Sequence, residues 1–235
     1  MPDATQTTLI YQRLRLAILD LDLTPGMRLT ERWLEAEFSA SRTPVRAALV
    51  RLEGEGLAQR HGRGWIVSPI DLVELESLAE FREAVETAVV RLAVERATND
   101  ELRALEQQVR VREATSAEEQ HAVAPDFHLE LARLSANPFL TSAVEGIMTR
   151  LARTRWLEAR TASAGEQAAA EHAEILRALL SRDADAAAAL VVEHIRGTRA
   201  RLAHSLSGDR KGLAARGVSI VGAGGATGVA NDRGR

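Results

Sequence analysis

Apolar positions in the first part of the chain recur with a helical period and are interrupted by turns. Residues 10–21 hold one such stripe, which a Pro-Gly turn ends. Thr30 offers a hydroxyl cap to a second, short helix, and the apolar spacing within residues 41–54 predicts a third. Two strand-like runs within residues 57–67 flank a glycine-containing turn and predict a hairpin. This order of elements predicts a winged helix-turn-helix domain over residues 1–70.

Beyond that hairpin the strand signals stop and the pattern becomes helical. Apolar stripes of helical period, separated by polar breaks, predict an all-helical bundle of about six helices over residues 71–206. Thr98 and Glu101 have the spacing of a capping box at the start of one of these helices. Residues 207–235 are rich in glycine and show no sustained period, so we expect a flexible tail there. The predicted fold class is therefore mainly α.

Composition narrows the class of protein without deciding its partner. The chain has no cysteine, which excludes disulfides and thiolate metal sites and favours a reducing cytoplasm. No apolar run is long enough to suggest a membrane span. The net charge of −3 argues weakly against nucleic acid, yet residues 1–70 carry nine arginines against eight acidic residues. Whether the protein binds nucleic acid therefore has to be judged from the placement of those arginines rather than from the total charge.

Two arginines lie at the start of the third predicted helix. Arg42 and Arg46 are four residues apart, so they share a face that the apolar stripe does not use. In a helix-turn-helix this end of the helix enters the major groove, where an arginine fits guanine O6 and N7. Thr43 and the amides of the first turn suit a phosphate, and Arg32 of the preceding helix could join them.

The predicted wing carries a further cation. Gly62 allows the backbone to approach the sugar-phosphate or the minor groove closely, and Arg63 follows it directly. Each arginine by itself could equally be a solvated side chain, because the chain is rich in arginine and contains a single lysine. As a set, on the two elements that would face DNA, the arginines favour DNA binding.

The stretch "LTPGMRLTERWLEAEFSASRTPVRAALVRLEGEGLAQRHGRGWIVSPI" resembles the DNA-binding domain of the GntR family of bacterial transcription regulators. The resemblance extends over nearly all of residues 8–70. It implies a cytoplasmic homodimer that binds double-stranded operator DNA. The family's DNA contacts fall on Arg32, Arg42, Thr43, Arg46 and Gly62 of this sequence.

Three histidines in the helical part have apolar neighbours on their own helix faces. They are His128, His172 and His194. A single inward histidine is more often a satisfied core residue than a ligand. Three of them from separate helices of one bundle could instead converge on a divalent metal through neutral imidazoles. The residues alone leave both interpretations open.

The segments "FHLELARLSANPFL" and "EHAEILRALLSRDADAAAA" and the later "EHI" resemble the FCD ligand-binding domain of the FadR-type branch of the GntR family. Many members bind a metal through one aspartate and three histidines, and the three histidines match. The aspartate, usually four residues before the first histidine, is replaced by Ala124. The resemblance thus implies either a three-histidine site for zinc or nickel, completed by water, effector, His121 or Asp126, or a pocket without metal.

The stretch "EFREAVE" resembles the first helix of the same domain and places Arg82 and Glu86 near the pocket. Arg82 could bind an effector carboxylate, or it could form an intrahelical ion pair with Glu86. Arg155, like Arg150 and Arg153, is a weaker candidate for the effector. We therefore expect an effector-responsive regulator, not an enzyme, that responds to a small carboxylate. A three-histidine metal-dependent hydrolase and a metal-free regulator of an apolar acyl ligand are the alternatives.

Overall fold

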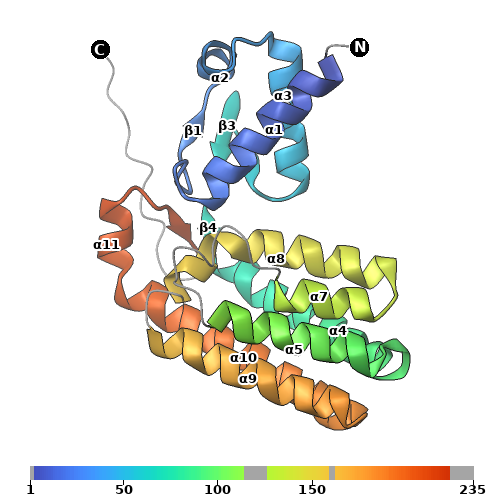
Figure 1. Cartoon of the computed structure of the whole chain (residues 1–235). Helices are drawn as coiled ribbons and strands as arrows, with labels where there is room; N and C mark the ends of the chain where they lie inside the picture. The colour runs from blue at the N-terminus through green and yellow to red at the C-terminus, as the bar shows by residue number, and fades with distance from the viewer. Residues whose placement is uncertain (1–2, 114–125, 159–161, 223–235) are drawn as a thin grey trace. The chain divides into compact units, whose positions relative to one another are not determined.

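The computed structural model describes residues 3–113, 126–158 and 162–222 (Figure 1). The chain forms two compact units. The first contains Met1–Glu76 together with Arg210–Arg235, and the second contains Ser77–Asp209. Among the helices in these ranges, none is both long enough and apolar enough to cross a membrane.

Three helices and a short strand build the first unit around one core. They are α1 (Asp3–Leu19), β1 (Arg28–Leu29), α2 (Glu31–Glu37) and α3 (Arg42–Gly54). The Thr30 side chain accepts a hydrogen bond from the Trp33 backbone and so starts α2, as the sequence predicts. The fully buried side chains of the core include Ile10, Ile18, Leu34, Leu49 and Leu52. They are among the apolar positions that the helical pattern predicts to face inward, whereas Trp33, also predicted to face inward, is exposed.

The wing is an antiparallel hairpin of β2 (Ala58–His61) and β3 (Gly64–Val67). Its two-residue turn contains Gly62 at a φ of +57°, a conformation that glycine adopts without strain. β1 pairs with β3 and extends the hairpin to a three-stranded sheet of order β1-β3-β2. A strand of two residues is too short to show an alternating pattern, so the sequence did not reveal it. The predicted winged helix-turn-helix is confirmed.

The segment after residue 206 differs from the predicted flexible tail. The structure places α11 (Arg210–Ala215) and β5 (Ile220–Val221) there, and β5 pairs in parallel with β4 (Ile70–Asp71). Leu213 and Val218 are buried, which supplies the apolar contacts that a helix of six residues needs. The prediction of flexibility is therefore wrong for residues 207–222, and residues 223–235 lie outside the described part of the chain.

The second unit is a bundle of antiparallel and crossing helices. The described ones are α4 (Leu72–Arg96), α5 (Asn99–Glu113), α7 (Phe127–Leu134), α8 (Pro138–Glu158), α9 (Ala162–Leu180) and α10 (Ala184–Gly208). The Thr98 hydroxyl and the Glu101 carboxylate bond each other's backbone amides, so the predicted capping box is confirmed. One continuous apolar core runs through the bundle. The all-helical architecture that the sequence predicts is thus present.

Candidate functional site

The predicted base-reading arginines lie on the outer face of α3. Val45 and Leu49 on the opposite face are fully buried, which fixes the rotation of the helix about its axis. The side chains of Arg42 and Arg46 are consequently 68% and 51% exposed, and Thr43 beside them is also exposed. The first turn of α3 therefore presents two guanidinium groups and a hydroxyl to solvent.

A carboxylate that the sequence analysis did not single out connects the two arginines. Arg42 Nε donates to Glu31 Oε2 at 2.6 Å, and Arg46 Nε lies 3.4 Å from Glu31 Oε1. Glu31 is the first residue of α2, and its side chain is only 17% exposed. Its eleven-residue separation from Arg42 lies outside the helical spacings by which ion pairs are recognised in a sequence.

The remaining predicted DNA contacts are also on the surface of the first unit. Arg32 is exposed on α2, and Gly62 and Arg63 form the exposed turn of the wing. Close to the turn of the wing, the Arg60 guanidinium lies over the Trp65 ring, 4.1 Å from its centroid. The structure thus joins Arg42 and Arg46 through Glu31, while Arg32 and the wing residues occupy neighbouring elements of the same unit.

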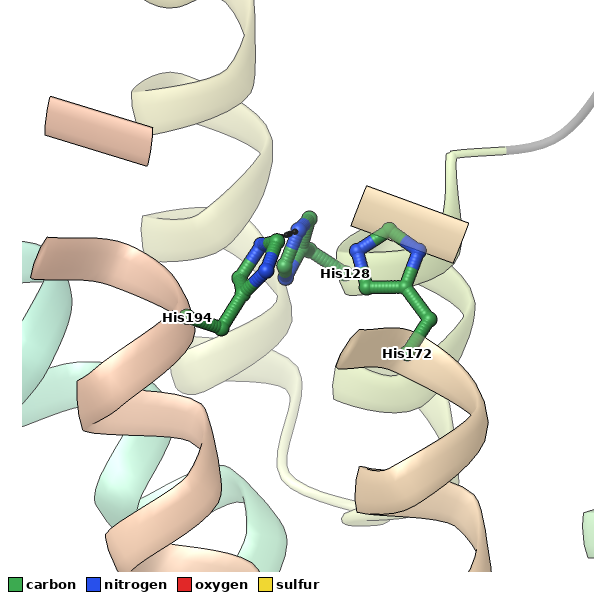
Figure 2. Close-up of side chains that lie close together, drawn as sticks. All are labelled: His128, His172 and His194. Carbon is green, nitrogen blue, oxygen red and sulfur yellow. Dashed lines mark hydrogen bonds between the residues drawn. The ribbon is translucent and has the colours of Figure 1, made fainter. Parts of the chain in front are cut away.

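The three histidines converge in the second unit. His128 comes from α7, His172 from α9 and His194 from α10, and Figure 2 shows their rings turned toward one another. One nitrogen from each ring lies within 4.8 Å of the others. His128 Nε2 and His194 Nε2 are 3.2 Å apart. A tetrahedral zinc ion with bonds of about 2.0–2.1 Å holds neighbouring nitrogens at a similar separation.

Two carboxylates fix the orientation of these rings. His128 Nδ1 lies 2.8 Å from Glu86 Oε2, and His194 Nδ1 lies 2.7 Å from Glu171 Oε2. A nitrogen beside a carboxylate carries the proton, so in both rings the Nε2 lone pair faces the cluster. Metal-binding histidines commonly have this arrangement, in which a carboxylate orients the ring. Glu171 directly precedes His172 in the sequence, but nothing in the pattern indicated that it serves His194.

The protonation states fit a cation site. Burial lowers the pKa of the His194 imidazole from 6.5 to about 4, and burial also lowers the pKa of His128. Although burial opposes it, hydrogen bonds from His194 and Arg201 hold the pKa of Glu171 at about 2. Both rings are therefore neutral near pH 7, which is the form that binds a metal. The residues present accordingly fit a divalent ion held by three nitrogens.

Arg82 enters the same cluster from α4. It is 4% exposed, and its Nε donates to Glu86 Oε1 in the intrahelical pair that the sequence analysis considered. Its Nη2 also donates to His128 Nε2 at 2.7 Å. Against the effect of burial, the charge of Arg82 and the hydrogen bonds that Glu86 accepts from His128 and Arg82 hold the pKa of Glu86 at about 2. The guanidinium thus uses the lone pair of His128 that a metal would need.

Of the other predicted residues near this site, Asp126 has a structural role, and several lie outside the described part of the chain. Asp126 caps α7, because its Oδ1 accepts hydrogen bonds from the backbone amides of His128 and Leu129. Ala124 and His121 lie outside the described residues. Arg155 belongs to α8, but its side chain is also outside the described part, whereas the nearby Arg153 is buried.

Comparisons with known proteins agree with both units. Residues 77–197 match the family model of the FCD domain, and residues 6–67 match the model described as bacterial regulatory proteins, gntR family. The Nta operon transcriptional regulator of Aminobacter aminovorans is 33% identical over 175 residues, which is 73% of this chain and 82% of that protein. The HTH-type transcriptional repressor RspR of Escherichia coli K12 is 28% identical over 191 residues, covering 79% and 84% of the two chains.

Solved structures show the same fold. The E. coli protein McbR/YncC superposes with a TM-score of 0.68 at 23% identity, over 85% of this chain and 97% of that one. A GntR protein of Rhodococcus sp. RHA1 gives a TM-score of 0.70 at 22% identity, over 85% and 98%. From the two domain matches and the similarity to the Aminobacter regulator, the chain belongs to the GntR family of bacterial transcription regulators and has a DNA-binding winged helix-turn-helix and an FCD domain.

Proposed function

We propose that this GntR-family regulator binds its operator as a homodimer and that a small carboxylate, bound with a divalent metal in the helical unit, changes operator affinity. Residues 1–70 would serve as the DNA-binding domain and residues 71–206 as the effector domain. The observation that carries the proposal is the cluster of three histidines beside a buried arginine. An effector can alter DNA affinity only if it binds one conformational state of the protein more tightly than another.

His128, His172 and His194 would hold the metal, with zinc or nickel as the ion. When bound, the ion would supply positive charge and an open coordination position for a carboxylate oxygen. Glu86 and Glu171 keep the protons of His128 and His194 on Nδ1, which leaves both Nε2 atoms unprotonated. The protein side of the site therefore needs no change of tautomer.

Arg82 links the two ligands. It donates to His128 Nε2, so it has to release that nitrogen before a metal can bind there. Its freed Nη groups could then donate to an effector carboxylate, while Glu86 retains Nε. Arg155 is the second predicted cation for the effector. Metal and effector would consequently bind cooperatively, and each would raise the affinity of the other by the same factor.

The test is calorimetric titration of hydroxy acids and dicarboxylic acids into the full chain, with and without zinc or nickel. We expect tighter binding in the presence of metal, and loss of both metal and effector binding in His172→Ala. His204→Ala is the matched control, because His204 is an exposed histidine of α10. Equal affinity with and without metal would contradict the metal-dependent mechanism and support a metal-free regulator.

The relatives are named as regulators, and the proposal assigns the histidine cluster to regulation rather than to turnover. Hydrolysis of an ester or amide substrate that requires zinc and is lost in His172→Ala would contradict this assignment. The operator duplex is first selected from a random library with the wild-type protein. Fluorescence anisotropy then measures the affinity of the protein for that duplex. Addition of metal with effector should then change the operator affinity.

A further inference from the structure

The two exposed arginines of α3 are held by one carboxylate from another helix. Glu31 directs one oxygen to Arg42 Nε and the other toward Arg46 Nε. Glu35, one turn further along α2, lies 3.8 Å from Arg42 Nε. Glu31 is mostly buried between the helices, whereas both arginine side chains are more than half exposed.

The position of Glu31 is fixed by the start of α2. Thr30 caps this helix, and Leu34, one turn after the cap, is fully buried in the core. The carboxylate thus extends from an anchored turn, unlike the free side chains of most surface ion pairs, which contribute little. Arg42 and Arg46 are also like charges four residues apart on one helix, and such pairs repel each other. Glu31 offsets that repulsion.

The atoms used by Glu31 matter for base reading. Each arginine faces the carboxylate with its Nε, so Glu31 does not use the Nη1 and Nη2 donors of these exposed side chains. A bidentate contact to guanine O6 and N7 requires two donors in a fixed fork. A guanidinium already held along its inner side loses less freedom when it binds a base than a freely rotating one. At the same time, a negative charge beside two arginines weakens their attraction to the phosphates of any sequence.

We propose that Glu31 is a positioning residue that determines specificity: it directs Arg42 and Arg46 to base edges and opposes their use as general phosphate contacts. The proposal rests on the proposed operator binding through these two arginines. It predicts that DNA binding without Glu31 becomes less selective rather than simply weaker.

The experiment compares wild type with Glu31→Gln by fluorescence anisotropy, using the full chain, the selected operator duplex and a scrambled duplex of equal length over a range of salt concentrations. We expect the ratio of operator to scrambled affinity to fall about tenfold, within the range for loss of a bidentate base contact. Affinity for scrambled DNA should stay equal or rise. Its salt dependence should steepen by about 0.9 in log–log slope for each arginine that turns to a phosphate.

Glu37→Gln is the control, because it removes the same charge from an exposed position of the same helix. It should leave the ratio unchanged. An equal loss of affinity on both duplexes, or the same change of ratio in Glu37→Gln, would overturn the proposal. A wild-type protein without preference for any selected duplex would instead contradict operator binding itself. Thermal unfolding of Glu31→Gln in the absence of DNA separates a loss of folding from a loss of selectivity.

Discussion

Gly26 is the position at which docking of the C-terminal segment can be tested most directly. Its φ is +90°, and an added Cβ would lie 2.5 Å from the Cβ of Ser219. On either side of this contact Ser219 N donates to Pro25 O at 2.8 Å, and Ile70 N donates to Ser219 O at 2.9 Å. Gly26→Ala therefore places a methyl group where residue 219 now lies.

The expected magnitude has two parts. A left-handed φ costs a residue with a Cβ about 1–2 kcal/mol. Forcing a methyl group into an occupied, packed position typically costs about 1–3 kcal/mol more. Gly26→Ala should thus destabilise the first unit by about 2–5 kcal/mol, the sum of these two effects. Gly62→Ala isolates the first effect, because Gly62 has a φ of +57° but no heavy atom within 4 Å of an added Cβ.

The assay is a double-mutant cycle measured by thermal or urea unfolding without DNA. Ser219→Gly removes the side chain that the new methyl group would meet. In the Gly26→Ala background it should therefore raise the free energy of unfolding by about 1–3 kcal/mol, whereas in the wild-type background it should change that free energy little. Gly62→Ala should show no such coupling to Ser219→Gly. A coupling free energy below about 0.5 kcal/mol would show that residue 219 does not dock against the turn at Gly26.

Three further predictions concern DNA and the histidine cluster. Arg46→Ala should weaken operator binding by about 1–3 kcal/mol and reduce the preference over scrambled DNA; an equal loss on both duplexes in anisotropy titrations would restrict Arg46 to phosphate contacts. Glu171→Gln should lower metal affinity by about 10- to 100-fold, measured by competition with a chelating dye, because it removes the carboxylate that orients His194. In chelator, stability should fall as the pH drops from 6.5 toward 4, by up to about 3 kcal/mol, because the unfolded chain protonates its histidine before the buried His194 does. Urea unfolding should show that this part of the pH dependence is absent from His194→Gln.

The sequence was sufficient to predict the helices that have an apolar stripe of helical period or a capping residue of their own. Thr30 and the box of Thr98 with Glu101 start helices where predicted, because a cap depends on residues only three apart. The three histidines could be selected because each lies among apolar residues on its own helix. Such local signals remain readable whatever the rest of the chain does.

Contacts between residues far apart in the chain could not be predicted from the sequence. The pairing of Ile70 with Ile220 joins strands of two residues, which are too short for any alternation to be visible. Glu171 and Glu31 contact partners 23 and 11 residues away, and no rule of helix spacing connects them. Only the packing of α9 against α10 and of α2 against α3 brings these carboxylates to their partners.

The two helices that contribute Arg82 and His194 are each continuous in the chain with the small sheet of the first unit. α4, which carries Arg82, begins directly after β4, and α10, which carries His194, leads through α11 to β5. β4 pairs with β5 inside the first unit, whereas the chain passes between the units at Glu76–Ser77 and at Asp209–Arg210. Release of His128 by Arg82 would act on α4, and fixing of His194 would act on α10. Both helices lead to the same sheet, α4 directly from β4 and α10 through α11 to β5. A regulator with a single connection between its units would have to transmit these events through one linker. This chain has two connections, and the strands β4 and β5 to which they lead are paired with each other.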